Sequence, residues 1–109
     1  MKIKRFLLFL TLCFLFILQK SFADESKMTM GLEIFNEIAG CAACHVLKAA
    51  GSEGNIGPNL DTVEGLNYDS VMDIVTHGLG VMPAFGEDEI LTKEQIDIVS
   101  FYVANSVGK

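Results

Sequence analysis

The chain begins with an apolar stretch that shows no helical or strand periodicity. A basic start is followed by residues 6–18, which are apolar except for Thr11, and small residues then lead up to Ala23. A basic start, a core of 13 apolar residues and a small-residue end are typical of a secretory signal peptide. We therefore expect residues 1–23 to be a cleaved signal peptide and residues 24–109 to be one mature domain.

Two other interpretations of this stretch are weaker. An uncleaved membrane anchor needs about 20 apolar residues to span a bilayer, and this core has only 13. A lipoprotein signal built on Cys13 would place Leu12 where a small residue is needed, and Cys13 lies in the middle of the apolar core.

The mature part shows three amphipathic patterns with apolar residues at helical spacing. They predict helices over about residues 29–39, 69–77 and 92–106. The third pattern is the clearest, because Thr92 and Gln95 form a capping box. The other residues expected at helix ends are Thr29 as a start and Gly40 and Gly78 as stops.

Long glycine-containing segments separate these helices. Residues 49–66 and 78–86 are irregular, and no stretch alternates convincingly between apolar and polar positions. The fold class predicted is all-α. Three short helices in 86 residues bury little apolar surface, so a large apolar cofactor bonded to the chain would fill the core.

Removal of the signal peptide makes the protein strongly acidic. Four of the eight basic residues lie in residues 1–23, while all 14 acidic residues lie in the mature part, so its formal charge is 4 − 14 = −10. Nucleic acid and anionic lipid would be repelled by this charge. A protein partner with a basic docking patch is favoured.

Two cysteines and a histidine form the one strong chemical motif. Cys41, Cys44 and His45 have the spacing C-x-x-C-H, which is typical of covalent haem attachment. Two thiols three residues apart can each form a thioether with one haem vinyl group, and the histidine that follows can bind the iron. We expect one haem c, attached in an exported protein.

Three other interpretations of the cysteines are weaker. A thioredoxin-like dithiol would need a strand before Cys41, and none is predicted. A zinc site would need two more ligands, and His77 is the only further histidine. A simple disulfide would leave His45 without a role and the core unfilled.

Met82 is the best candidate for a second axial ligand. It lies in a glycine-bounded loop 37 residues after His45 and is followed by Pro83, so the loop can fold over the far side of a haem. Met72 falls in an apolar helical stripe and is expected to fill the core. His77 is a weaker candidate and is expected to be a surface residue near a helix end. Met28 and Met30 lie too close in sequence to Cys41 to reach the opposite face of the haem easily.

Together these motifs resemble the class I cytochromes c over nearly the whole mature chain. The resemblance implies a cytochrome c fold, in which about three main helices wrap around one haem and the first and last helices cross. It also implies that the carbonyl of Pro58 accepts a hydrogen bond from His45, which orients the ligand. Gly31, Phe35 and Tyr102 match the packing positions of the crossing helices.

His45 and Met82 would occupy both axial positions of the iron, so we expect a periplasmic electron carrier and not an enzyme. Electrons would cross at an apolar edge of the haem, and the acidic run 87–89 could steer a basic partner.

The loops around Pro58 and Met82 are similar to those of small cytochrome subunits that accept electrons from sulfite dehydrogenases. The alternative function is a haem enzyme or gas sensor in which Met82 is displaced. The residues of the expected edge are Ala42, Ala43, Val81, Pro83 and Ala84.

Overall fold

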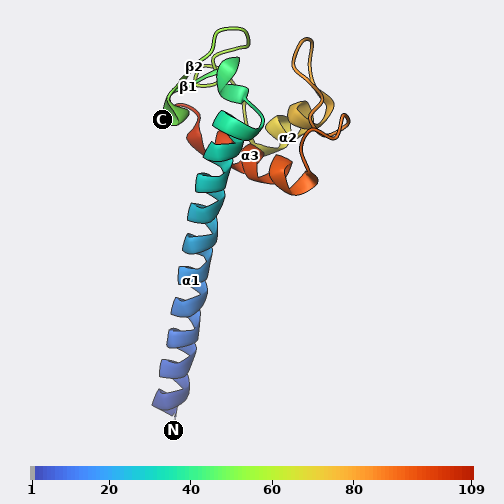
Figure 1. The fold of residues 1–109 in the computed structure, drawn as a ribbon. Helices are drawn as coiled ribbons and strands as arrows, with labels where there is room; N and C mark the ends of the chain where they lie inside the picture. The colour runs from blue at the N-terminus through green and yellow to red at the C-terminus, as the bar shows by residue number, and fades with distance from the viewer. Residues whose placement is uncertain (1) are drawn as a thin grey trace.

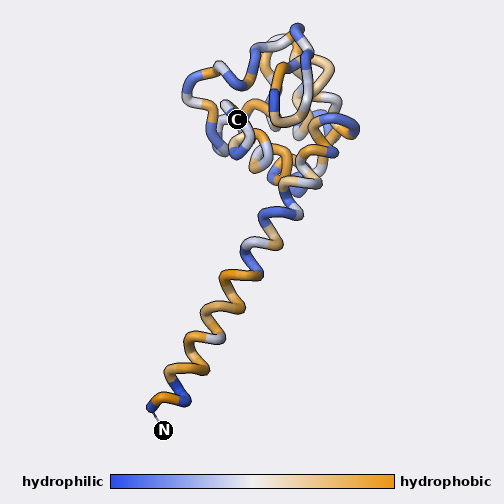
Figure 2. The backbone as a smooth tube through the Cα atoms, turned by 90° about the vertical axis from the view of Figure 1, so that its left-hand side faces the viewer, coloured by the Kyte–Doolittle hydropathy of each residue, from blue (hydrophilic) through white to orange (hydrophobic). Residues whose placement is uncertain are grey.

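The computed structural model describes residues 2–109, so Met1 of the expected signal peptide lies outside the described residues. Its longest element is helix α1 (Lys2–Glu33), which projects from the remainder of the chain (Figures 1 and 2). Every side chain from residue 2 to residue 26 is exposed. The helix is long and apolar enough to cross a membrane, a test that signal sequences also pass.

The start predicted for the first mature helix was wrong. Thr29 does not cap a helix: its hydroxyl donates to the carbonyl of Glu25, one turn earlier within α1. The reason is local, because no glycine or proline lies between residues 1 and 30 to interrupt the helix. The helix then widens into a π-helical turn, η1 (Ile34–Ile38), closed by a hydrogen bond of 2.8 Å from Ala39 N to the Ile34 carbonyl.

Helices α2 (Tyr68–His77) and α3 (Lys93–Ser106) form where the pattern predicts them. The capping box of α3 is present, with Thr92 and Gln95 each bonding the backbone amide of the other. A second capping box, formed by Asn67 and Ser70, starts α2 one residue before the predicted position.

The segment between α1 and α2 contains short elements only. In order these are η2 (Cys41–Ala43), β1 (Val46–Leu47), η3 (Lys48–Ala50) and β2 (Ser52–Glu53). Strands β1 and β2 pair antiparallel, with Val46 opposite Glu53 and Leu47 opposite Ser52. A two-residue ladder is too short to produce an alternating pattern, so the sequence did not indicate it.

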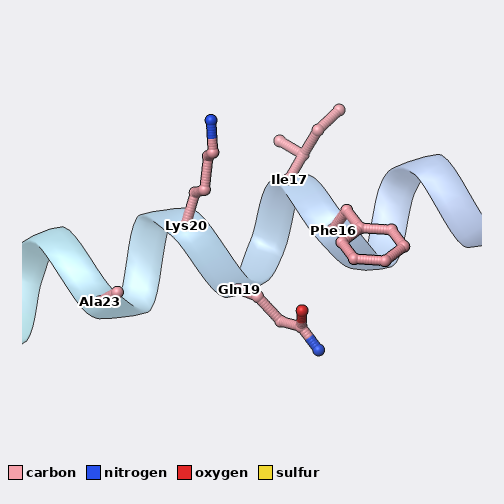
Figure 3. Close-up of a pocket in the computed structure, with 5 residues that line it drawn as sticks. All are labelled: Phe16, Ile17, Gln19, Lys20 and Ala23. Carbon is pink, nitrogen blue, oxygen red and sulfur yellow. The ribbon is translucent and has the colours of Figure 1, made fainter.

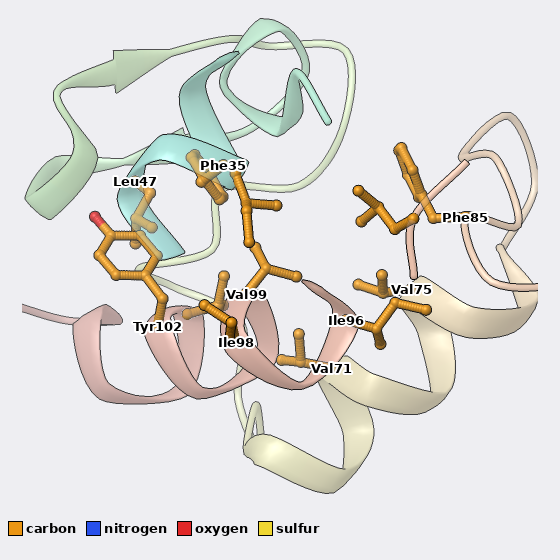
Figure 4. Packing of buried hydrophobic residues seen from close by; sticks show 12 residues of the cluster. Phe35, Leu47, Val71, Val75, Phe85, Ile96, Ile98, Val99 and Tyr102 are labelled. Carbon is orange, nitrogen blue, oxygen red and sulfur yellow. The ribbon is translucent and has the colours of Figure 1, made fainter. Parts of the chain in front are cut away.

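The mature end of α1 crosses α3 at a glycine. A Cβ on Gly31 would lie 2.2 Å from the Cβ of Tyr102, so only glycine allows the two helices to approach this closely. The Phe35 and Tyr102 rings pack with their centroids 6.1 Å apart. The buried core therefore lies on α3, which contacts both α1 and α2 (Figure 4).

A polar contact also joins the three helices. Asp97 of α3 accepts a hydrogen bond from Tyr68 of α2 and pairs with Lys27 of α1 at 3.3 Å. The Tyr68 hydroxyl and the Lys27 ammonium hold the pKa of Asp97 below its ordinary value. The bond to Asp97 in turn raises the pKa of Tyr68 to about 12. At neutral pH Tyr68 is therefore an uncharged donor and Asp97 an ionised acceptor.

Candidate functional site

The C-x-x-C-H segment folds as one tight turn. Gly40 has φ 69°, a left-handed conformation that glycine adopts without strain, and it lets the chain leave η1 and enter η2. The amides of Cys44 and His45 both donate to the carbonyl of Cys41, at 3.1 and 3.0 Å. Cys41 and Cys44 are half-buried and unpaired, so both thiols are held on a single turn of backbone.

Burial raises the pKa of the Cys41 thiol to about 11. This thiol is therefore protonated at neutral pH. Dithiol oxidoreductases need a thiolate at the attacking cysteine, with a lowered pKa. The environment of Cys41 is the opposite of the one that such a reaction requires.

His45 is fixed by the backbone around Pro58. Its Nδ1 atom lies 2.8 Å from the carbonyl oxygen of Pro58, and a carbonyl can only accept, so Nδ1 carries the proton. A Cβ on Gly57 would lie 2.5 Å from Cε1 of His45. The missing side chain at Gly57 thus lets the imidazole lie against the backbone, and the free lone pair of the ring is on Nε2.

Three residues to which the sequence analysis gave no role hold the backbone of the segment that carries His45. Ser52 is buried and accepts from the amide of Leu47 at 2.9 Å, while its hydroxyl donates to the carbonyl of His45 at 2.8 Å. A Cβ on Gly54 would lie 2.6 Å from the backbone of Ala43, so glycine is needed there. Asp61 is the third.

Asp61 ties this segment to the end of the chain. Its carboxylate accepts from the amide of Lys48 and from the amide of Gly108, both at 2.9 Å. Glycine is itself a signal of close backbone approach, and it could have drawn attention to residues 54 and 57. Nothing in the sequence pairs Asp61 with Gly108, because they are 47 residues apart.

Met82 lies on a separate loop that follows α2. Gly78 has φ 74° at the end of the helix, and Leu79 and Met82 then exchange backbone hydrogen bonds of 3.3 and 3.0 Å. Met82 is half-buried against the core, whereas Val81 is 89% exposed. His77 is exposed at the end of α2.

The two segments that carry the predicted site residues rise on the same side of α3, away from the N-terminus (Figure 1). Phe35 and Leu47 lie on one side of the core and Val75 and Phe85 on the other, above residues of α3 (Figure 4). The structure therefore brings Cys41, Cys44, His45 and Pro58 together in one segment. It places Met82 on the second segment, packed against the same core.

These residues fit a haem c. Two free thiols on one turn can form two thioethers, and the bond from Nδ1 to Pro58 leaves Nε2 as the atom able to bind iron. Cys41, Ala42, Leu60, Met72 and Met82 are partly buried apolar or sulfur-containing residues packed against the core. Among residues 2–109, no cluster of three or more His, Cys, Asp or Glu residues is placed to hold a bare metal ion.

The outer part of α1 offers no comparable arrangement. Five residues there line a shallow surface, but all of them come from one helix and every side chain in this region is exposed (Figure 3). This part of the chain supplies no site. The residues are Phe16, Ile17, Gln19, Lys20 and Ala23.

Comparison with known proteins identifies a family and a similar solved structure. Residues 26–103 match the family model described as cytochrome C oxidase, cbb3-type, subunit III. The crystal structure of the c-type cytochrome SorU from Sinorhizobium meliloti is 44% identical in sequence and superposes with a TM-score of 0.70. The match covers 78% of this chain and 95% of that one. No curated protein matches the chain significantly.

Proposed function

The chain belongs to the c-type cytochrome family whose model matches residues 26–103, and from this premise we propose that it is a periplasmic carrier of single electrons. One haem c is attached through Cys41 and Cys44, and its iron is held by His45 and Met82. The cytochrome fold and a role in electron transfer follow from the family and from the structural match. The ligand set, the location and the partner are the proposal.

The observation that carries the ligand set is the hydrogen bond from Nδ1 of His45 to Pro58. It orients the imidazole, fixes its tautomer and raises the basicity of Nε2. Gly57 leaves room for this orientation, and Ser52 holds the carbonyl of His45 from the other side. These contacts support His45 as an iron ligand, because they fix the orientation of its ring within the protein.

The bound haem supplies an iron that gains and loses one electron. The protein determines how readily it does so: a methionine ligand such as Met82 raises the reduction potential, and an apolar surrounding adds to this effect. With His45 and Met82 both bound, no substrate can coordinate. The residues therefore support electron transfer and not catalysis at the iron.

Export through cleavage after Ala23 has structural support. Side chains 2–26 are exposed, whereas Lys27 and Met28 are the first that are half-buried, and the family match starts at residue 26. Removal of residues 1–23 would leave every packing contact of the domain intact. N-terminal sequencing of the secreted protein should give Asp24 as the first residue, and an intact N-terminus would contradict the cleavage.

The electron donor that we propose is a sulfite dehydrogenase with a basic docking patch. The support is the sequence resemblance of the two loops to cytochrome subunits of such enzymes, together with the charge of −10 after cleavage. Val81 and Pro83 are exposed and could form an apolar contact, with acidic residues 87–89 close behind. The association rate with the donor should fall as salt rises, because screening weakens the attraction.

Absorption spectroscopy of the purified holoprotein tests the ligand set. A low-spin ferric spectrum with the methionine–iron charge-transfer band is expected in the wild type and should disappear in Met82→Ala. A high-spin spectrum, or one that changes readily with carbon monoxide, would contradict the proposal and favour a haem enzyme or gas sensor.

A further inference from the structure

The loop that carries Met82 leaves α2 and returns to the same end of it. After Gly78 the chain makes the turn around Met82, and the amides of Gly86 and Glu87 then both donate to the carbonyl of Thr76, at 3.2 and 3.1 Å. The loop is therefore closed at its base by backbone hydrogen bonds to the last turn of the helix.

One side-chain pair reinforces this closure. Nδ1 of His77 donates to the carboxylate of Glu87 at 2.6 Å, and this is the one ion pair within residues 2–109 that joins α2 to the loop. The carboxylate of Asp73, on the same helix as His77, lies 3.7 Å from Nε2. Glu87 and, more weakly, Asp73 raise the pKa of the His77 imidazole, which favours its charged form.

Phe85 is buried in the core near the base of the loop, but little else restrains the part from Leu79 to Pro83. Leu79 and Val81 are 70% and 89% exposed, so they add almost no packing. Met82 itself is half-buried, and its amide and carbonyl are bonded only to Leu79, inside the same turn. The position of Met82 thus depends on how firmly the two ends of the loop are held.

We propose that the His77–Glu87 pair is a clasp that closes the base of the Met82 loop. By holding the loop in place, the clasp makes it harder for an external ligand to displace Met82. The part of this inference that concerns ligand exchange rests on the proposed function, since it takes Met82 as the iron ligand. His77 is then a positioning residue: it acts through the loop and not on the iron.

Binding of imidazole to the ferric holoprotein tests the clasp, because imidazole must displace Met82 to bind. His77→Ala and Glu87→Ala should each tighten imidazole binding about two- to five-fold, the range expected for an exposed ion pair. The double variant should be no tighter than either single variant, because both remove the same interaction. Equal affinities in the wild type and both single variants would overturn the proposal.

Asp73→Ala is the matched control. It also removes a carboxylate next to His77, but from the helix itself, so it leaves the loop closure intact. Imidazole affinity should stay unchanged in this variant. Tightening equal to that of Glu87→Ala would show that charge alone, and not closure of the loop, is responsible, and would also overturn the proposal.

Amide hydrogen exchange of the holoprotein tests the clasp independently of the iron ligand. The amides of Gly86 and Glu87 should exchange about two- to five-fold faster in both single variants and at the wild-type rate in Asp73→Ala. If the wild type lacks the methionine charge-transfer band, the proposed ligand set fails while the exchange rates still decide on the clasp. Unchanged exchange at both amides would overturn it.

Discussion

The interface between α1 and α3 and the two loops that carry the site are stabilised in different ways. At the interface Gly31 sits against Tyr102 so closely that no side chain fits between the helices, and the contact is apolar and buried. The loops contain few buried side chains. They are held by single hydrogen bonds, such as the one from His45 to Pro58 and those to the carboxylate of Asp61.

This difference separates stability from chemistry. Close packing between helices supplies most of the burial, and it tolerates almost no change in volume. Hydrogen-bonded loops bury less but fix individual atoms, as Nδ1 of His45 is fixed here. A substitution at the interface should therefore lower stability, whereas one in the loops should change the haem while the fold persists.

The largest effect is expected from removing the covalent link in the first loop. Cys41→Ala combined with Cys44→Ala should release all of the haem on denaturation, because no thioether remains. Haem staining of a denaturing gel measures this. Cys13→Ala, in the segment expected to be cleaved, should keep the stain at the wild-type level; stain retained by the double variant would contradict covalent attachment at this motif.

A substitution at the interface comes next. Gly31→Val should lower the free energy of unfolding of the holoprotein by about 3 kcal/mol, because its side chain overlaps Cβ of Tyr102. Denaturant titration measures the change. Thr29→Val, on an exposed position two residues earlier, should change it by less than about 0.5 kcal/mol. If Gly31→Val lowered the free energy of unfolding as little as the control does, α1 and α3 would not approach each other closely at Gly31.

Gly57→Ala should change the reduction potential of the haem, whereas Gly31→Val should mainly lower the stability of the fold. The added Cβ meets the ring of His45 and disturbs its bond to Pro58, so the weaker ligand stabilises ferric iron less. We expect the reduction potential to rise by on the order of 60 mV, which corresponds to a tenfold change in relative affinity. Potentiometric titration measures this.

The control for Gly57→Ala is Gly65→Ala. Gly65 has φ 73° and no atom within 4 Å of an added Cβ. This variant should lose about 1 kcal/mol of stability through backbone strain and keep its potential. Equal potentials in Gly57→Ala and the wild type would show that the loop does not position His45.

The smallest effect concerns pH. The folded state raises the pKa of His77 above its ordinary value of 6.5, so its pairing stabilises the fold below about pH 6.5 and is lost as pH rises through the folded-state pKa. The denaturation midpoint of the wild type should exceed that of His77→Ala at about pH 5.5, and the two should converge at about pH 9. A constant difference across this range would contradict the assignment.

Much of the helical part followed from local patterns. The capping box at Thr92 and the helix end at Gly78 appear in the structure as predicted, because both depend on residues within one turn. The start at Thr29 failed for the same reason: a cap competes with helix propagation, and nothing upstream of Thr29 stops the helix. The spacing of apolar residues did not indicate the π-helical turn that starts at Ile34.

The haem attachment motif could be predicted from the sequence alone, because C-x-x-C-H requires only residues close together in the chain. The sequence also indicated three helices, since their apolar spacing is local. The folded structure was needed to show which carboxylate closes the base of the Met82 loop and which one ties Lys48 to Gly108. Such contacts join residues 10 to 47 positions apart, and their geometry depends on the path of the loops in space and not on any spacing that the sequence displays.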